Sequence, residues 1–404
     1  MPARSGMAFV VIFHLDPTQK SLTPEILQKD TAMRVVEARE GADVEQDCVY
    51  VIPPNKMLSI RLGKLRMTSP AEPRGHRLPV DFFLKSLAID QNTRSVGIIF
   101  SGSDTDGTQG IRAIKELGGF TMAQEESTAQ YGGMPHNAIA TGMVDRVLPV
   151  EKMPDVLVEH ARKRTPALTV EEEVLRKEDF SSQLGAVFAL LRTRTGHDFS
   201  GYKRSTLVRR LERRMHLLRH KDLPEYIDYM RSNVQEAEFL VKELLIGVTN
   251  FFREPKVFAM LRSKIIPKLL QKHSTGGSLR VWVPGCATGE EAYSIAILLV
   301  ERMMELKENF RIQIFATDIH EDALATARSG LYPESIASEV SVDRLKWFFT
   351  KEGNGYRISK QIRDMMVFAI HDLVRDAPFS RLDFISCRNV MIYLNKDLQK
   401  KLIP

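Results

Sequence analysis

Apolar runs of strand length alternate with helical patterns in two separate parts of the chain. In residues 1–157 the predicted strands are 8–13, 48–52, 95–101, 120–123 and 145–150. In residues 257–404 they are 279–283, 311–318, 365–370 and 382–386. Strands that alternate with helices are typical of parallel sheets, so the pattern predicts two α/β domains.

The region between these two parts has helical periodicity and few strand signals. Residues 158–178 are rich in charge and are expected to form a partly helical linker, and residues 179–256 are expected to form a small all-α domain. Inside the second α/β part, residues 351–356 have the composition of a hairpin turn between β-prone flanks. This predicts a small antiparallel insert near residues 347–366.

The strand predicted at 279–283 leads into the most informative segment of the chain. A turn containing Gly285 and Gly289 follows it, and a helix begins at Glu290. Strand, glycine turn and helix form the nucleotide-binding crossover of α/β domains. Glu290 and Glu291 occupy the first helical turn, where they would repel a pyrophosphate that needs a free helix N-terminus. S-adenosylmethionine has no phosphate and carries a cationic sulfonium and an ammonium group, so the acidic pair favours a methyltransferase.

Polar residues also follow other predicted strands. Asp318 lies 29 residues beyond Gly289, at the carboxyl end of the next strand. There it can accept hydrogen bonds from ribose hydroxyls. The alternative is that it does no more than cap the following helix. Arg253 follows two aromatic residues, and a half-buried guanidinium requires a carboxylate partner, which a cofactor could supply. By themselves, Arg388 and Asn389 are explained by helix capping and surface charge.

Composition narrows the class of protein. The chain has 404 residues, 43% of them hydrophobic, and a net charge of +6, as in ordinary globular proteins of two or three domains. No apolar run approaches the ~20 residues of a membrane helix, so no membrane insertion is expected. Three scattered cysteines fit neither a disulfide framework nor a metal cluster, which predicts a reducing, cytoplasmic location and no metal site.

Positive charge is concentrated between residues 201 and 220, which contain seven Lys or Arg and one Glu. Such a run is typical either of a solvated helix face or of a docking surface for an acidic partner. It is not interleaved with aromatic residues that could stack on bases, so a nucleic-acid partner is not expected.

Four segments of residues 181–404, taken in order, closely resemble the CheR-type chemotaxis receptor methyltransferases. They are Asp-Phe-Ser-Gly-Tyr-Lys-Arg at 198–204, Leu-Ile-Gly-Val-Thr-Asn-Phe-Phe-Arg at 245–253, Gly-Cys-Ala-Thr-Gly-Glu-Glu at 285–291 and Cys-Arg-Asn-Val at 387–390. The resemblance implies an all-α domain followed by a Rossmann-like domain. It also implies transfer of a methyl group from S-adenosylmethionine to glutamate side chains on chemoreceptor cytoplasmic helices.

The same resemblance assigns roles to individual residues. Cofactor-binding positions, with the first turn glycine included, are Thr249, Arg253, Gly285, Glu291, Asp318, Asp372, Leu373, Arg388 and Asn389. The arginines implied to dock an acidic receptor surface are Arg209, Arg210, Arg213 and Arg214. Gly247 stands where some relatives have an asparagine that contacts the cofactor, so that contact is not assigned here. Because the substrate carboxylate is itself the nucleophile, catalysis is expected to come from proximity and in-line orientation.

Residues 1–157 resemble the CheB-type methylesterase domain. The similar segments include Phe-His-Leu-Asp-Pro at 13–17, Val-Ile-Pro-Pro-Asn at 51–55 and Gly-Met-Pro at 133–135. By this resemblance His14 and Asp106 are the His and Asp of a Ser-His-Asp triad. Without the resemblance, His14 and Asp106 are more simply explained as two unrelated polar residues at the starts of loops. The family's nucleophilic serine belongs to an upstream turn that this sequence lacks, so no methylesterase activity is expected.

The leading hypothesis is an S-adenosylmethionine-dependent protein-glutamate methyltransferase fused to an incomplete methylesterase domain, with both domains expected to be truncated. One alternative is a methyltransferase for a different acidic substrate. The other is a non-catalytic signalling scaffold that binds S-adenosylmethionine or a receptor. In the leading hypothesis the partner is a chemoreceptor.

Overall fold

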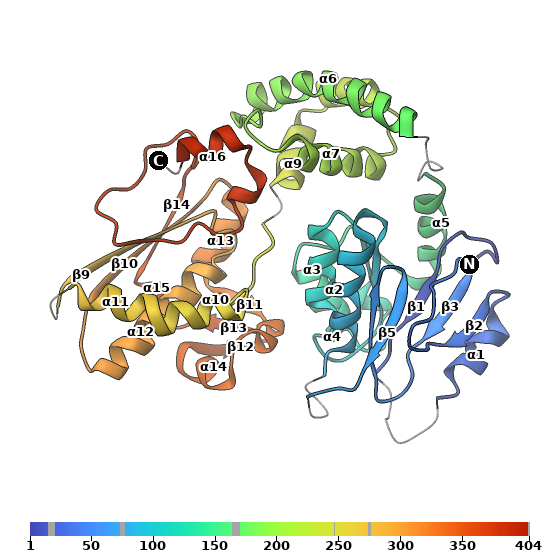
Figure 1. The fold of residues 1–404 in the computed structure, drawn as a ribbon, viewed down its shortest axis with the longest axis horizontal. Helices are drawn as coiled ribbons and strands as arrows, with labels where there is room; N and C mark the ends of the chain where they lie inside the picture. The colour runs from blue at the N-terminus through green and yellow to red at the C-terminus, as the bar shows by residue number, and fades with distance from the viewer. Residues whose placement is uncertain (15–20, 73–76, 164–169, 246, 274–275, 403–404) are drawn as a thin grey trace. The chain divides into compact units, whose positions relative to one another are not determined.

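The computed structural model describes residues 1–14, 21–72, 77–163, 170–245, 247–273 and 276–402. The chain divides into two compact units, Met1–Val170 and Glu171–Pro404 (Figure 1). Each unit is built around parallel strands that alternate with helices, which confirms the predicted α/β class.

The first unit contains two three-stranded parallel sheets, ordered β1-β3-β2 and β6-β7-β8. Their strands are β1 (Phe9–Val11), β2 (Arg34–Glu37), β3 (Cys48–Val51), β6 (Val96–Ile99), β7 (Phe120–Gln124) and β8 (Arg146–Leu148). All but β2 were predicted. A hairpin of β4 (Met57–Arg61) and β5 (Lys64–Thr68) was also not predicted. It buries Leu58, Ile60 and Leu65 in the core of the unit, which explains why it forms.

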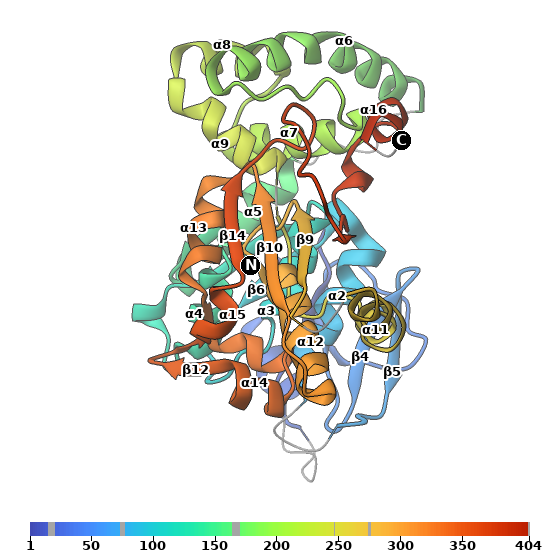
Figure 2. The same ribbon diagram turned by 90° about the vertical axis from the view of Figure 1, so that its left-hand side faces the viewer.

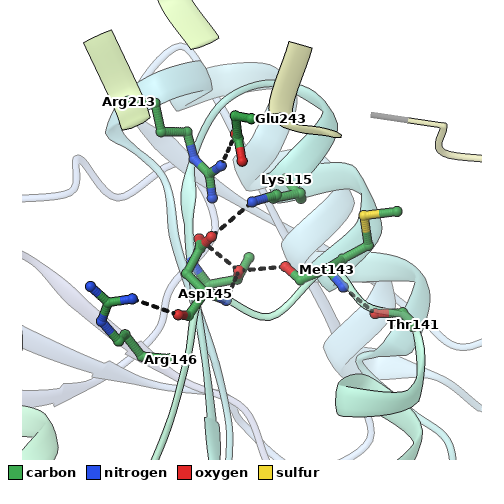
Figure 3. Close-up of polar contacts among 8 residues, drawn as sticks. Lys115, Thr141, Met143, Asp145, Arg146, Arg213 and Glu243 are labelled. Atoms are coloured by element: carbon green, nitrogen blue, oxygen red, sulfur yellow. Dashed lines mark hydrogen bonds and ion pairs between the residues drawn. The ribbon is translucent and has the colours of Figure 1, made fainter. Parts of the chain in front are cut away.

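The helices of this unit are α1 (Thr23–Asp30), α2 (Pro79–Gln91), α3 (Thr108–Glu116), α4 (Gly133–Ala140) and α5 (Met153–Lys163). A polar network joins α3 to the β7–β8 connection (Figure 3). Lys115 Nζ lies 2.8 Å from Asp145 Oδ1, and the Thr121 hydroxyl oxygen lies 2.7 Å from Met143 O and 2.9 Å from Asp145 Oδ2, within reach of either acceptor for its one proton. These contacts fix the entry into β8.

The second unit begins with the predicted all-α region. Its helices are α6 (Val170–Thr195), α7 (Arg204–Leu218), α8 (Leu223–Ser232) and α9 (Val234–Leu244). Asp222 and Asn233 cap α8 and α9 by accepting backbone N–H groups of their first turns. The apolar faces meet in a core that includes Leu184, Leu191, Leu211, Tyr226, Met230 and Leu240. Residues 158–178, expected to be a partly helical linker, contain the end of α5 and the start of α6.

The rest of the second unit has a four-stranded parallel sheet in the order β14-β10-β9-β15, with β14, β10 and β9 side by side (Figure 2). The strands are β9 (Ser278–Pro284), β10 (Arg311–Asp318), β14 (Met366–Ile370) and β15 (Phe384–Ile385). The helices are α10 (Pro255–Met260), α11 (Ile266–Gln271), α12 (Glu290–Leu306), α13 (Glu321–Ser329) and α16 (Lys396–Leu402). Residues 292–300 of α12 are all buried, as expected for a helix that is apolar on every side.

The predicted insert is a three-stranded antiparallel sheet in the order β11-β13-β12. Its elements are β11 (Leu331–Pro333), α14 (Val342–Phe348), β12 (Phe349–Glu352), β13 (Gly355–Ile358) and α15 (Lys360–Arg363). The predicted turn joins β12 to β13, whereas β11 was not foreseen. Tyr332, Phe349 and Ile358 belong to the same core as the parallel sheet, so insert and sheet form one packed body.

Candidate active site

The loop between β9 and α12 has a backbone that favours glycine. Gly285, Ala287 and Gly289 have φ values of +65°, +47° and +93°. A Cβ on Gly285 would come within 2.3 Å of Val390 Cγ2, and one on Gly289 within 2.9 Å of the Cβ of Ala327. Both glycines are therefore required by close packing as well as by conformation, and the loop delivers the N-terminus of α12 to the carboxyl edge of the sheet.

Asp318 lies at the end of β10, where the sequence pattern placed it. Its Oδ2 accepts a hydrogen bond from Ala287 N at 2.8 Å, and its Oδ1 accepts one from His320 N at 2.9 Å. Burial raises the pKa of Asp318, and these two N–H donors oppose that effect. Each carboxylate oxygen can accept a second hydrogen bond, so acceptor capacity remains for hydroxyl groups of a ligand.

Glu291, in the first turn of α12, joins the glycine loop to the end of β15. Its Oε1 accepts a hydrogen bond from Ser386 Oγ at 2.6 Å, and its Oε2 lies 3.4 Å from Arg388 Nη1. Burial raises the pKa of Glu291, with Ser386 and the arginines opposing. Arg388 Nη2 also donates to Arg253 O at 2.9 Å and lies 3.4 Å from Glu254 Oε2. This carboxylate–guanidinium cluster links segments that are distant in sequence.

The segment containing Thr249 and Arg253 approaches the same edge. Arg253 Nη1 donates to Val248 O, and its positive charge opposes the rise that burial causes in the pKa of Glu291. Phe252 and Glu254 have left-handed φ values of +51° and +60°. Ala287 and Asn389, near the same edge, also have left-handed φ values, of +47° and +57°, as do several described residues elsewhere in the chain.

The end of β14 completes the edge. The N–H of His371 donates to Asp318 O at 3.0 Å, which places Asp372 and Leu373 just beyond the end of β10. Asp372 Oδ1 accepts a hydrogen bond from Val374 N at 2.8 Å and so shapes this turn. The structure thus brings Arg253, Glu291, Asp318 and Arg388 to one edge of the sheet, with Asp372 just beyond it, and the cofactor-binding role of the predicted residues stays a prediction.

Several residues of this edge were not predicted as site residues. Ser386 binds Glu291, and its position directly after β15 was the available signal. Tyr202 comes from the all-α region, and its backbone pairs with Leu394. Burial raises the pKa of Tyr202, and the charges of Asp372 and Asp318 raise it further. The all-α region therefore contributes to the surroundings of the site.

The basic run lies largely on α7, and three of its arginines have partners in other segments of the second unit. Arg210 Nη1 donates to Leu244 O, and the guanidinium lies 5.1 Å from the ring centroid of Tyr393. Arg214 forms two hydrogen bonds with Glu236, at 2.9 and 2.8 Å. Such bidentate pairs hold a guanidinium in a fixed orientation.

Arg213 pairs with Glu243 of α9 (Figure 3). Three of the four arginines assigned to receptor docking thus also hold α7 against neighbouring segments. The charge pattern did not indicate these internal pairs, because their acceptors lie 22 to 34 residues away in sequence. The docking role of Arg209, Arg210, Arg213 and Arg214 stays a prediction.

In the first unit, His14 and Asp106 are brought together. His14 Nε2 lies 2.9 Å from Asp106 Oδ2, and this contact raises the pKa of His14. The Asp106 carboxylate is fully buried at the N-terminus of α2, where it accepts hydrogen bonds from Val80 N at 2.9 Å and Asp81 N at 2.8 Å. The two residues are paired as the His and Asp of a triad are, but the contact uses Nε2, whereas the His of the serine-protease triad binds its aspartate through Nδ1.

The described part of the chain also bears on metal binding and on membrane insertion. Among these residues, no group of three or more His, Cys, Asp or Glu side chains could hold a metal ion. None of the described helices is both long and apolar enough to cross a membrane.

Comparison with protein families gives three matches along the chain. Residues 1–157 match the CheB methylesterase family. Residues 182–245 match the all-alpha domain of CheR methyltransferase, and residues 247–404 match its SAM binding domain. The order of these matches is the order of the folded regions described above.

Several known proteins are similar to parts or most of the chain. An uncharacterised 104.1 kDa protein of Rhodobacter capsulatus is 34% identical over 93% of this chain, which spans 41% of that protein's length. A chemotaxis protein methyltransferase of Borreliella burgdorferi is 32% identical over 54% of this chain and 80% of its own length. Chemotaxis protein methyltransferase 2 of Pseudomonas aeruginosa is 32% identical over 59% of this chain and 84% of its own length. The crystal structure of the Thermotoga maritima CheB methylesterase catalytic domain matches 39% of this chain and 86% of its own, with 29% identity and a TM-score of 0.37.

Proposed function

Since this chain belongs to the chemotaxis protein methyltransferase family and carries a CheB-like domain before its CheR-like domains, we propose that it methylates chemoreceptors. The methyl donor is S-adenosylmethionine, and the acceptors are glutamate carboxylates on the cytoplasmic helices of the receptor. Arginines of α7 other than the buried Arg210 contribute to docking of that acidic helical surface.

The observation that supports this function best is the charge at the start of α12. Glu290 and Glu291 stand in the first turn of α12, where a dinucleotide-binding protein would need room for a pyrophosphate. Carboxylates suit a ligand that carries an ammonium and a sulfonium group. We assign Asp318 to the ribose hydroxyls and Arg253 to the carboxylate of the methionine moiety. Arg388, through its contact with Glu291, holds this cluster together.

Catalysis of this reaction depends on the placement of the two reactants and not on proton transfer. A glutamate oxygen of the receptor forms a bond to the methyl carbon while the bond from that carbon to sulfur breaks, and S-adenosylhomocysteine leaves. The acceptor is ionised at neutral pH, so no proton moves. Proximity and in-line orientation can supply a large part of the rate enhancement. The residues at the sheet edge therefore act by binding and orienting the donor.

The test is incorporation of label from methyl-labelled S-adenosylmethionine into a chemoreceptor cytoplasmic fragment, measured as alkali-labile methyl groups. The full chain is expected to incorporate label, and Asp318→Ala is expected to lose incorporation. Asp343→Ala, which alters an exposed carboxylate in the first turn of α14, is the matched control and should retain it. Failure of the unaltered chain to incorporate label, despite binding S-adenosylhomocysteine, would instead support a non-catalytic scaffold.

A further inference from the structure

We propose that Tyr332 of the antiparallel insert is a positioning residue for the donor site, an inference that rests on the proposed function. Tyr332 lies on β11 and is 3% exposed. Its hydroxyl donates a hydrogen bond to Thr288 O at 2.7 Å. Thr288 belongs to the glycine loop, so a side chain of the insert holds the backbone that leads into α12.

The contact falls where the loop has little freedom to compensate for its loss. Ala287 and Gly289, on either side of Thr288, both have left-handed φ values. A Cβ on Gly289 would lie 3.3 Å from the Tyr332 hydroxyl oxygen, which shows how closely the ring approaches the backbone. Asp318 holds Ala287 N from one direction, and Tyr332 holds Thr288 O from another. Together they fix a conformation that the sequence alone would not favour.

The insert also supports the second segment of the site. The Phe251 ring packs edge-on against Tyr332 and Phe349, with centroid distances of 4.9 and 5.4 Å. Phe251 N donates to Glu339 Oε2 at 2.7 Å. The segment that ends at Arg253 is thus held by both aromatic and polar contacts of the insert.

These contacts predict an effect on donor affinity that is separate from overall stability. Loss of the Tyr332 hydroxyl leaves the ring in the core but frees the Thr288 carbonyl. The loop then spends part of its time outside the binding conformation. The apparent affinity for the donor falls in proportion to the fraction of molecules that remain in that conformation. Loss of one neutral hydrogen bond can therefore weaken binding by at most about fivefold.

The experiment compares Tyr332→Phe with Tyr356→Phe in the full chain. Tyr356 is opposite Tyr332 on the neighbouring strand, so the control makes the same chemical change in the same sheet. Calorimetry with S-adenosylhomocysteine should show binding that is weaker by up to about fivefold for Tyr332→Phe and unchanged for the control. The KM for S-adenosylmethionine should rise by the same factor while kcat changes little, a separation that a purely structural role would not produce.

Equal binding by Tyr332→Phe and the unaltered chain, or equal losses in both variants, would overturn the proposal. If Tyr332→Phe does not fold, Glu339→Gln is the second variant, because its amide oxygen still accepts from Phe251 N. It should weaken binding roughly threefold, since a neutral acceptor replaces a charged one. Absence of binding by the unaltered chain would instead refute the proposed function and this inference with it.

Discussion

Asp81 offers a test of the electrostatics of the first unit. Its carboxyl group is 2% exposed and accepts a hydrogen bond from Gly110 N at 2.6 Å, while its own N–H donates to Asp106. Burial, followed by the nearby negative charge of Asp106, raises the pKa of Asp81 to about 7. The folded unit therefore binds a proton that the unfolded chain releases above its ordinary pKa of 3.8.

The sign of the pH dependence follows from that difference. Between about pH 4 and pH 7 the folded state holds more protons than the unfolded state, so its stability falls as pH rises. A shift of roughly three pKa units corresponds to at most about 4 kcal/mol of unfolding free energy across this range. Asp81→Asn keeps an acceptor oxygen for Gly110 N and removes the titrating group. The variant should lose this part of the pH dependence.

The assay is urea unfolding at several pH values, followed by far-ultraviolet circular dichroism and tryptophan fluorescence together. Both tryptophans, Trp282 and Trp347, lie in the second unit, so their fluorescence serves as an internal control. The difference between the two signals reports on the first unit. An equal dependence of its stability on pH in Asp81→Asn and in the unaltered chain would refute the reasoning.

Two further predictions concern the candidate sites. Gly285→Ala puts a methyl group 2.3 Å from Val390 Cγ2 at a φ of +65°. The variant should bind S-adenosylhomocysteine more than tenfold more weakly in calorimetry, which corresponds to about the cost of one strained residue. Unchanged affinity would contradict this prediction. The chain should release no methanol from a methylated receptor fragment in neutral buffer. Enzymatic methanol release that His14→Ala abolishes would show that this expectation is wrong.

The sequence predicted those parts of the site that depend on local pattern. The position of Asp318 followed from strand length, and the placement of Gly285 and Gly289 followed from the strand–turn–helix pattern. The hydrogen bond from Ala287 N to Asp318 was beyond prediction, because it depends on a left-handed loop residue. Ser386 and Glu291 lie 95 residues apart, and no periodicity relates them.

The same distinction explains the elements and charges that were missed or read differently. Strand β11 is three residues long and is recognisable only through its pairing with β13. The number of charged residues around α7 predicted a solvated or docking face. It could not reveal that Arg214 pairs with Glu236 of α9. Tertiary partners, unlike helical periodicity, leave no regular spacing in the sequence.

The environment of Asp106 has a consequence for how such domains are classified. Its carboxylate joins the first turn of α2 to the loop before α3, through contacts that do not involve His14. A domain under no selection for ester hydrolysis would still be selected to keep this aspartate, because its loss would leave buried N–H groups without acceptors. The presence of this aspartate in a related domain is therefore no evidence that the domain still hydrolyses esters. The presence of the histidine is the more informative sign of esterase activity.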